Sequence, residues 1–147
     1  MKASVFAIVL FASPAFADVT VTDGDTIRQH GATFRLHGID APEYRQTCAD
    51  GWPAGIVAAS ALREMVRDRR VICEPRSTDR YGRTVALCRA DGVDIGAEMV
   101  RAGWAWAFTR YSHDYARQED EAWATRVGVH GHDCMPAWDW RALQKRQ

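Results

Sequence analysis

The chain reads VTVTDGDTIRQHGATFRLHGIDAPE over residues 19–43, and this stretch decides the fold that we expect. Apolar and β-branched residues fill three short runs, which turn dipeptides at Asp23-Gly24 and His30-Gly31 separate. Alternating runs divided by glycine turns are typical of antiparallel strands. The stretch therefore predicts a three-stranded meander, with strands over residues 19–22, 26–29 and 33–39.

Helical and strand patterns alternate along the rest of the chain. Apolar residues at helical spacing after a proline predict a helix over residues 53–69. Asp94 is a suitable N-cap, and Gly103 a suitable stop, for a short helix through Arg101. We also expect a helix over residues 113–126 and strands over residues 70–74 and 84–89. Five short strands with helices at the corners predict an α+β fold, a five-stranded, partly closed Greek-key β-barrel of the oligonucleotide-binding (OB) type with three α-helices.

The start of the chain has the pattern of an export signal. Lys2 supplies a positive end, an apolar run covers residues 5–11, and Ala15-Phe16-Ala17 is a small-x-small cleavage site. The alternative is an uncleaved membrane anchor, but the run is interrupted by serine and proline and is too short to span a bilayer. We expect residues 1–17 to be a signal peptide. Residues 18–147 would then be one exported domain, periplasmic or secreted, with no stable membrane insertion after cleavage.

Four cysteines lie in this expected domain. An even number of cysteines in an oxidising compartment is typical of disulfides. Cys73 and Cys88 fall in two strands that neighbour each other in the sequence, so a bridge between them fits strand geometry. Cys48 with Cys134 then follows by elimination. The alternative is four free, buried thiols.

Basic and acidic side chains balance in this sequence, with 19 of each. Residues 18–147 contain 18 basic and 19 acidic side chains, and 17 of the basic residues are arginine. Nonspecific binding to nucleic acid depends on basic side chains that displace counterions, so net charge does not indicate such a partner. Phosphate binding would have to depend on local arginine forks and on a bound cation.

Three carboxylates stand at or just after the ends of strand-like runs. Asp25 follows the turn glycine, Asp40 ends the third run, and Glu43 follows Ala41-Pro42, whose restricted backbone holds it relative to Asp40. Two carboxylates can hold a divalent cation with help from a backbone carbonyl and water. Glu43 would then be free to take a proton from a water that attacks phosphorus.

Two arginines complete this set of residues. Arg35 lies in the third predicted strand, and Arg83 follows the turn at Tyr81-Gly82. Their guanidinium groups match the oxygens of a phosphate and would neutralise charge there. Each of these acids and arginines, taken singly, also has an ordinary interpretation as a turn, cap or surface residue. Together they predict metal-assisted cleavage of a phosphodiester in nucleic acid.

Three motifs, Asp-Gly-Asp-Thr, Arg-Leu-x-Gly-Ile-Asp-Ala-Pro-Glu and Asp-Arg-Tyr-Gly-Arg, occur here in a specific order and spacing. Through them the chain resembles the staphylococcal nuclease-like (thermonuclease) family, from about residue 19 to residue 131. The resemblance implies a five-stranded OB barrel with three helices. It also implies a calcium-dependent phosphodiesterase that acts on both DNA and RNA and leaves 3'-phosphate ends. We expect an endonuclease that acts as a monomer and favours single strands.

The resemblance also implies roles for individual residues. One Ca²⁺ would be held by Asp25, Asp40 and the carbonyl of Ala41; Glu43 would act as general base; Arg35 and Arg83 would bind phosphate; Arg80 and Tyr81 would contact the nucleotide; and Tyr111 would stack on a base. The sequence departs from the family at Ala41 and Thr109, where threonine and a second tyrosine are expected, and it lacks a lysine-rich surface.

Two further features have weaker interpretations. His130, His132 and Cys134 alternate in a way that could serve zinc or copper, although a polar loop is the interpretation that we prefer. Trp52 lies in the loop beside the expected site and is a candidate substrate contact. The alternative function is a catalytically inactive OB module that binds nucleic acid or protein in the cell envelope.

Overall fold

The computed structural model describes residues 18–146. The expected signal peptide, residues 1–17, lies outside the described residues. In the part that is described, no helix combines the length and apolar character that crossing a membrane requires.

Strands and helices alternate as the sequence pattern indicates. The strands are β1 (Val19–Asp23), β2 (Thr26–Gln29), β3 (Ala32–Leu36), β4 (Ile39–Asp40), β5 (Val71–Thr78), β6 (Thr84–Ala90), β7 (Val93–Asp94) and β8 (Trp106–Ala107). The helices are α1 (Ala54–Val66), α2 (Ile95–Arg101), α3 (Ala116–Thr125), the 3-10 helix η1 (Gly128–His130) and α4 (Ala137–Gln144). Helix α4 is an addition to the three helices expected from the sequence.

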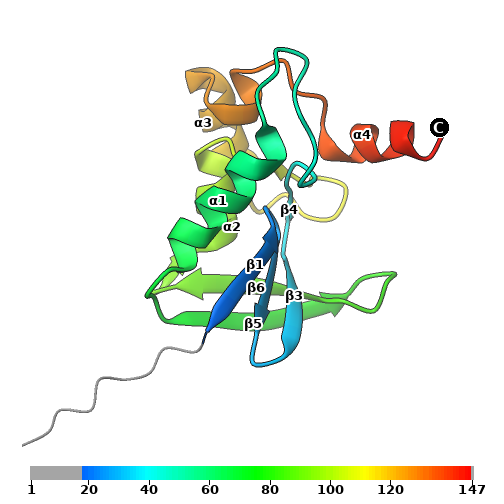
Figure 1. Ribbon diagram of the computed structural model, residues 1–147. Helices are drawn as coiled ribbons and strands as arrows, with labels where there is room; N and C mark the ends of the chain where they lie inside the picture. The colour runs from blue at the N-terminus through cyan, green and yellow to red at the C-terminus, as the bar shows by residue number, and fades with distance from the viewer. Residues whose placement is uncertain (1–17, 147) are drawn as a thin grey trace, which may run out of the picture.

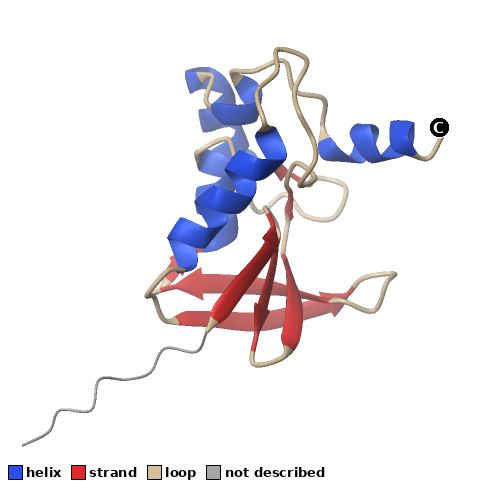
Figure 2. Ribbon diagram, viewed as in Figure 1, coloured by secondary structure: helices blue, strands red, loops and turns tan. Residues whose placement is uncertain are grey.

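The main sheet has the strand order β1-β2-β3-β6-β5, and β7 pairs with β6. Strands β1, β2 and β3 form the predicted antiparallel meander. Strand β3 then runs parallel to β6, which itself is antiparallel to β5. Helices α1, α2 and α3 gather over one side of the strands, while α4 lies apart from them (Figure 1, Figure 2). These features confirm the α+β class.

The third predicted strand is divided in the structure. Gly38 has a φ of +71°, a conformation that favours glycine and that ends β3 before the chain continues into β4. Strand β4 leaves the main sheet and pairs with β8, with Asp40 opposite Trp106. This change of sheet places Asp40 at the end of a short, fully buried strand.

The main core joins α1 and α2 to the meander. Leu62 of α1 and Met99 of α2 are completely buried and belong to one cluster with Ile27 and Leu36. Each such side chain contributes roughly 1.5–3 kcal/mol through burial. The meander that carries Asp25 and Arg35 is therefore fixed on a rigid helical support.

A second, smaller cluster holds α4, and we name it the α4 anchor. It consists of Trp106, Val129 and Ala137, with Trp52, Cys134 and Trp138 packed against them. Ala137 is completely buried at the start of α4. The anchor attaches α4 to β8 and to the loop that precedes α1.

Both predicted disulfides are present in the structure. Cys73 of β5 and Cys88 of β6 lie directly opposite each other and are bonded. Cys48 and Cys134 are bonded across a sequence separation of 86 residues. Among residues 18–146, all four cysteines are therefore bonded. Two disulfides indicate a protein of an oxidising compartment outside the cytoplasm.

Candidate active site

Asp25 and Asp40 lie close together, and Arg35 contacts both. Arg35 Nη2 is 3.1 Å from Asp25 Oδ2 and 2.8 Å from Asp40 Oδ1. Asp25 is in the turn between β1 and β2, Asp40 ends β4, and both are buried, at 5% and 0% exposed. A single cationic nitrogen thus reaches both carboxylates at once.

The turn that carries Asp25 is tightly packed. A Cβ atom at Gly24 would lie 2.7 Å from the Cβ atoms of both Ala41 and Ala58, so only glycine fits there. The main-chain N–H of Ala41 donates to Asp25 Oδ2 at 3.2 Å, and the hydroxyl of Thr26 donates to Asp25 Oδ1 at 3.0 Å. These contacts fix the Asp25 carboxylate against the segment that leads to Glu43.

Burial dominates the electrostatics of Asp25. It raises the pKa of this carboxyl to about 7, although the positive charge of Arg35 opposes the shift. The pKa of Arg35 is raised in turn: burial alone would lower it, but the charges of Asp25 and Asp40 outweigh burial. A cation at this position would stabilise the ionised form of Asp25.

Glu43 is held firmly by its backbone, while its side chain is half-exposed, at 36%. Its N–H donates to Gln46 Oε1 at 3.2 Å, and its carbonyl accepts from the N–H of Gln46 at 2.7 Å. A Cβ atom at Gly55 would lie 1.8 Å from the Glu43 carbonyl oxygen, so the start of α1 packs directly on this backbone.

Arg141 of α4 reaches the same carboxylates. Its Nη2 donates to Asp40 Oδ2 at 2.7 Å, and its Nη1 donates to Asp40 Oδ1 at 3.1 Å and to Glu43 Oε1 at 2.7 Å. This residue is absent from the set predicted from the sequence. The basic tail gives a weak hint, but no spacing relates Arg141 to Asp40, which lies 101 residues earlier.

Arg83 and its neighbours lie in the hairpin between β5 and β6. Arg83 Nε donates to Asp79 Oδ2 at 2.7 Å, and the N–H groups of Tyr81 and Arg83 both donate to Asp79 Oδ1. The guanidinium groups of Arg80 and Arg83 lie 4.8 and 5.6 Å from the centre of the Tyr81 ring. Within the described residues, no hydrogen bond or ion pair connects this hairpin to Asp25, Asp40 or Glu43.

Within the described residues, the remaining candidates make no hydrogen bond or ion pair with Asp25, Asp40 or Glu43. Tyr111 is 80% exposed and its ring centre lies 4.9 Å from that of Phe108. Trp52 stacks on His132, with ring centres 4.2 Å apart, and His132 Nδ1 lies 2.7 Å from Asp50 Oδ2. Because Cys134 is in a disulfide, the alternating histidine and cysteine pattern has lost its thiolate. The polar-loop interpretation holds for His132, whereas His130 is buried and ends the 3-10 helix η1.

The donors around Asp25 and Asp40 fit a hard divalent cation. Within residues 18–146, no three His, Cys, Asp or Glu side chains are placed together to hold one ion. A cation would therefore rest on two carboxylates, with a backbone carbonyl and water completing an all-oxygen shell. The double contact of Arg35 Nη2 shows that one positive centre can reach both carboxylates.

Several known proteins are similar to this sequence over most of its length. The family described as "Staphylococcal nuclease homologue" matches residues 33–130. "Protein ParB" of Escherichia coli is 34% identical, covering 95% of this chain and 88% of that protein. A "Micrococcal nuclease" of Shigella flexneri is 31% identical, covering 99% and 94%. An "Uncharacterized endonuclease" of Haemophilus influenzae is 31% identical, covering 86% and 72%.

The fold and these similarities define the class as a metal-dependent nuclease, a hydrolase that acts on nucleic acid. The chain belongs to the staphylococcal nuclease family. The resemblance carried by the three sequence motifs is thereby confirmed.

Proposed function

We propose that the protein is a calcium-dependent endonuclease that hydrolyses DNA and RNA, with single strands favoured, and leaves 3'-phosphate ends. The observation that supports this most is the double contact of Arg35 with Asp25 and Asp40, beside Glu43. The motifs of the family supply the ion, the substrates and the products of the proposal. We further propose that it acts as a monomer with one Ca²⁺.

The proposed roles come from the family motifs, and the contacts among Asp25, Arg35, Asp40 and Glu43 support them. Asp25, Asp40 and the carbonyl of Ala41 would hold the ion, which when bound supplies positive charge that acidifies water and polarises a phosphoryl oxygen. Glu43 would take the proton from the attacking water, a contribution of about 10²–10⁴-fold. Arg35 would donate to the phosphoryl oxygens, where charge develops.

The residues of the β5–β6 hairpin would bind the substrate. Arg83 would bind phosphate when nucleic acid brings the hairpin against the site, and Arg80 and Tyr81 would contact the nucleotide. Tyr81 is 66% exposed, so its side chain is accessible to a nucleotide. Tyr111 would stack on a neighbouring base for the same reason.

We also propose that the protein is exported, as a periplasmic or secreted enzyme, after removal of residues 1–17. The two disulfides support an oxidising compartment. N-terminal sequencing of the protein recovered from the periplasm and the medium tests the cleavage before Asp18. A cytoplasmic protein that retains Met1 would contradict export.

The test of the proposed reaction is cleavage of single-stranded DNA and RNA oligonucleotides by the protein from residue 18 onward. We expect cleavage with calcium, none with chelator, and a 3'-phosphate by mass spectrometry. Glu43→Gln should lose about 10²–10⁴-fold in kcat, and Asp25→Asn with Asp40→Asn should also abolish calcium binding by calorimetry. Asp120→Asn, an exposed acid on α3, is the control. Equal rates with and without chelator would exclude the proposal.

A further inference from the structure

Glu43 has an unusual combination of a fixed backbone and a weakly held side chain. Among the described residues, Arg141 is the only side chain that hydrogen-bonds to the Glu43 carboxylate. Asp40, by contrast, is completely buried, and its carboxylate also accepts a hydrogen bond from Arg35. If Arg141 were absent, Asp40 would keep a partner, whereas the half-exposed Glu43 carboxylate would be free to rotate into solvent.

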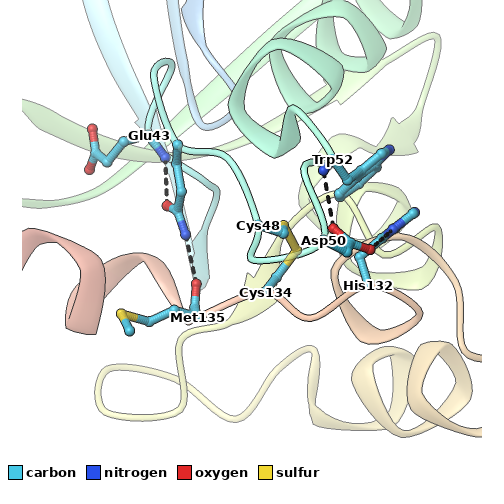
Figure 3. Close-up of a disulfide and its surroundings, with 8 residues drawn as sticks. Glu43, Cys48, Asp50, Trp52, His132, Cys134 and Met135 are labelled. Atoms are coloured by element: carbon cyan, nitrogen blue, oxygen red, sulfur yellow. Dashed lines mark hydrogen bonds and ion pairs between the residues drawn. A yellow bond between two sulfur atoms is a disulfide. The ribbon is translucent and has the colours of Figure 1, made fainter.

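A set of polar and covalent links fixes α4, which carries Arg141, against the Glu43 segment. Gln46 is 1% exposed; its Oε1 accepts from the Glu43 N–H, and its Nε2 donates to the Met135 carbonyl at 2.6 Å. Two residues further along this loop, Cys48 is bonded to Cys134, directly before Met135. Figure 3 shows these links running from Glu43 to Met135 and from Cys48 to Cys134. Helix α4 starts immediately afterwards, so Arg141 has a defined position relative to Glu43.

The guanidinium of Arg141 also has the geometry that such a role requires. Its two terminal nitrogens form a fork on Asp40, and one of them also contacts Glu43. Because the planar guanidinium of Arg141 binds the buried Asp40 through both terminal nitrogens, its orientation is fixed. Its Nη1, which contacts both carboxylates, then fixes the Glu43 carboxylate. A lysine at this position would present one nitrogen on a flexible stem and could not reproduce this arrangement.

We propose that Arg141 is a positioning residue of the active site, which uses Asp40 as its support and holds the Glu43 carboxylate in the orientation needed to act on the attacking water. This inference rests on the proposed function. It assigns to α4, which lies beyond the residues matched by the family, a part in the reaction.

The test compares Arg141→Gln, Arg141→Lys and the control Lys145→Gln, which makes the same charge change at the exposed end of the same helix. At saturating calcium and oligonucleotide, Arg141→Gln should lose about 10²-fold in kcat, because misplacement of a reacting group by about 1 Å costs that much. KM should change less than about threefold, because substrate binding is not removed. Arg141→Lys should recover only part of the loss. Lys145→Gln should match the wild type.

Two further measurements separate positioning from other roles. Calorimetry without nucleic acid should show calcium binding to Arg141→Gln at least as tightly as to the wild type, since a positive charge beside Asp40 is removed. In the Glu43→Gln background, Arg141→Gln should cost less than about threefold, because residues that act through each other are not additive. Thermal unfolding checks that the variants fold, and Arg141→Lys replaces Arg141→Gln if the latter does not.

Several results would overturn the inference. If Arg141→Gln kept the wild-type kcat, Arg141 would not position Glu43. If Arg141→Gln lost calcium binding, Arg141 would instead serve to orient Asp40 for the ion. A full additional loss in the Glu43→Gln background would mean that Arg141 contacts the substrate directly. If the wild type itself cleaves nothing, both the proposed function and this inference are wrong. If the wild type is active and Arg141→Gln is equally active, only the inference is wrong.

Discussion

Among the single residues, Asp25 combines deep burial with a carboxyl group that can ionise. Its carboxylate is 5% exposed, and burial raises its pKa from the usual 3.8 to about 7. Between these values the folded protein holds a proton that the unfolded chain has released. The free energy of unfolding therefore falls as pH rises through this window. The stabilisation that comes from the protonated Asp25 is fully present only below the pKa of Asp25 in the unfolded chain.

Replacing Asp25 by asparagine should remove this pH dependence. The amide stays neutral, so the stability of the wild type relative to Asp25→Asn should fall by about 1 kcal/mol or more between about pH 4.5 and pH 7.5. Urea denaturation of both proteins, in the presence of chelator, measures the difference. Burial also lowers the pKa of His130, but that effect is common to both proteins and cancels.

The same comparison made with Asp120→Asn, at the exposed surface of α3, serves as a control and should show no such trend. A constant difference between wild type and Asp25→Asn across the pH range would mean that Arg35 keeps Asp25 ionised.

Asp25, Asp40 and Glu43 could be selected as candidates from the sequence because each belongs to a local motif at or just after the end of a strand. Arg141 could not, because its partners Asp40 and Glu43 lie 101 and 98 residues earlier. Arg83 is the intermediate case. Its turn could be located from Tyr81-Gly82, but its pairing with Asp79 depends on side-chain geometry inside the hairpin.

Among the elements, the loop of residues 41–53 and α4 behave as one unit. The Cys48–Cys134 bond closes 86 residues and connects this loop to the start of α4. The Cys73–Cys88 bond closes only 15 residues, within the β5–β6 pair. The two disulfides therefore have different consequences for the site.

Removing each disulfide separately should reveal this difference. Cys48→Ser with Cys134→Ser should lower the free energy of unfolding by about 4 kcal/mol, and Cys73→Ser with Cys88→Ser by about 3 kcal/mol. In addition, the first pair should lose at least about tenfold in kcat, because α4 and Glu43 are no longer held together.

Cys73→Ser with Cys88→Ser is the matched control in this comparison and should keep its activity at temperatures where it remains folded. Urea denaturation and initial rates provide the two measurements. Equal losses of activity in both double variants would show that the Cys48–Cys134 bond acts only through global stability.

The presence and type of most elements could be predicted from local sequence, but several boundaries differ: β5 runs on to Thr78, and α3 begins only at Ala116. The N-cap predicted at Asp94 is present, with its side chain accepting from the N–H of Ala97 at 3.1 Å. The helix expected over residues 53–69 ends earlier, at Val66, and the left-handed Asp68 follows with a φ of +53°. The pairing of β4 with β8 was not accessible, because two-residue strands have no pattern of their own.

For the whole molecule, the balance of basic and acidic side chains determines how strongly the affinity for nucleic acid should depend on salt. Residues 18–147 carry 18 basic and 19 acidic side chains, so attraction comes from a few local arginines. The proposed phosphate and nucleotide contacts involve Arg35, Arg80 and Arg83. Affinity should therefore depend on salt through a small number of phosphate contacts.

We expect the affinity of Glu43→Gln for a single-stranded oligonucleotide to fall by about 20-fold between 50 and 200 mM salt, as for about three phosphate contacts. Fluorescence anisotropy with calcium present measures it. Adding Arg83→Gln should reduce the slope by about 0.7. Adding Arg117→Gln, whose partner is Glu121 on α3, should leave it unchanged. A slope steeper than about −5 would contradict binding through so few contacts.

The sequence by itself determined the family, the meander and the N-cap of α2 at Asp94, and it predicted Asp25, Asp40, Glu43 and Arg35 as candidate site residues, because local spacing and turn chemistry specify each of these features. Only the tertiary structure decided that β4 joins β8, that α4 docks beside Glu43 and that Arg141 reaches Asp40. The physical reason is that these contacts join segments about 100 residues apart, through burial and ion pairing that leave no periodic trace in the sequence.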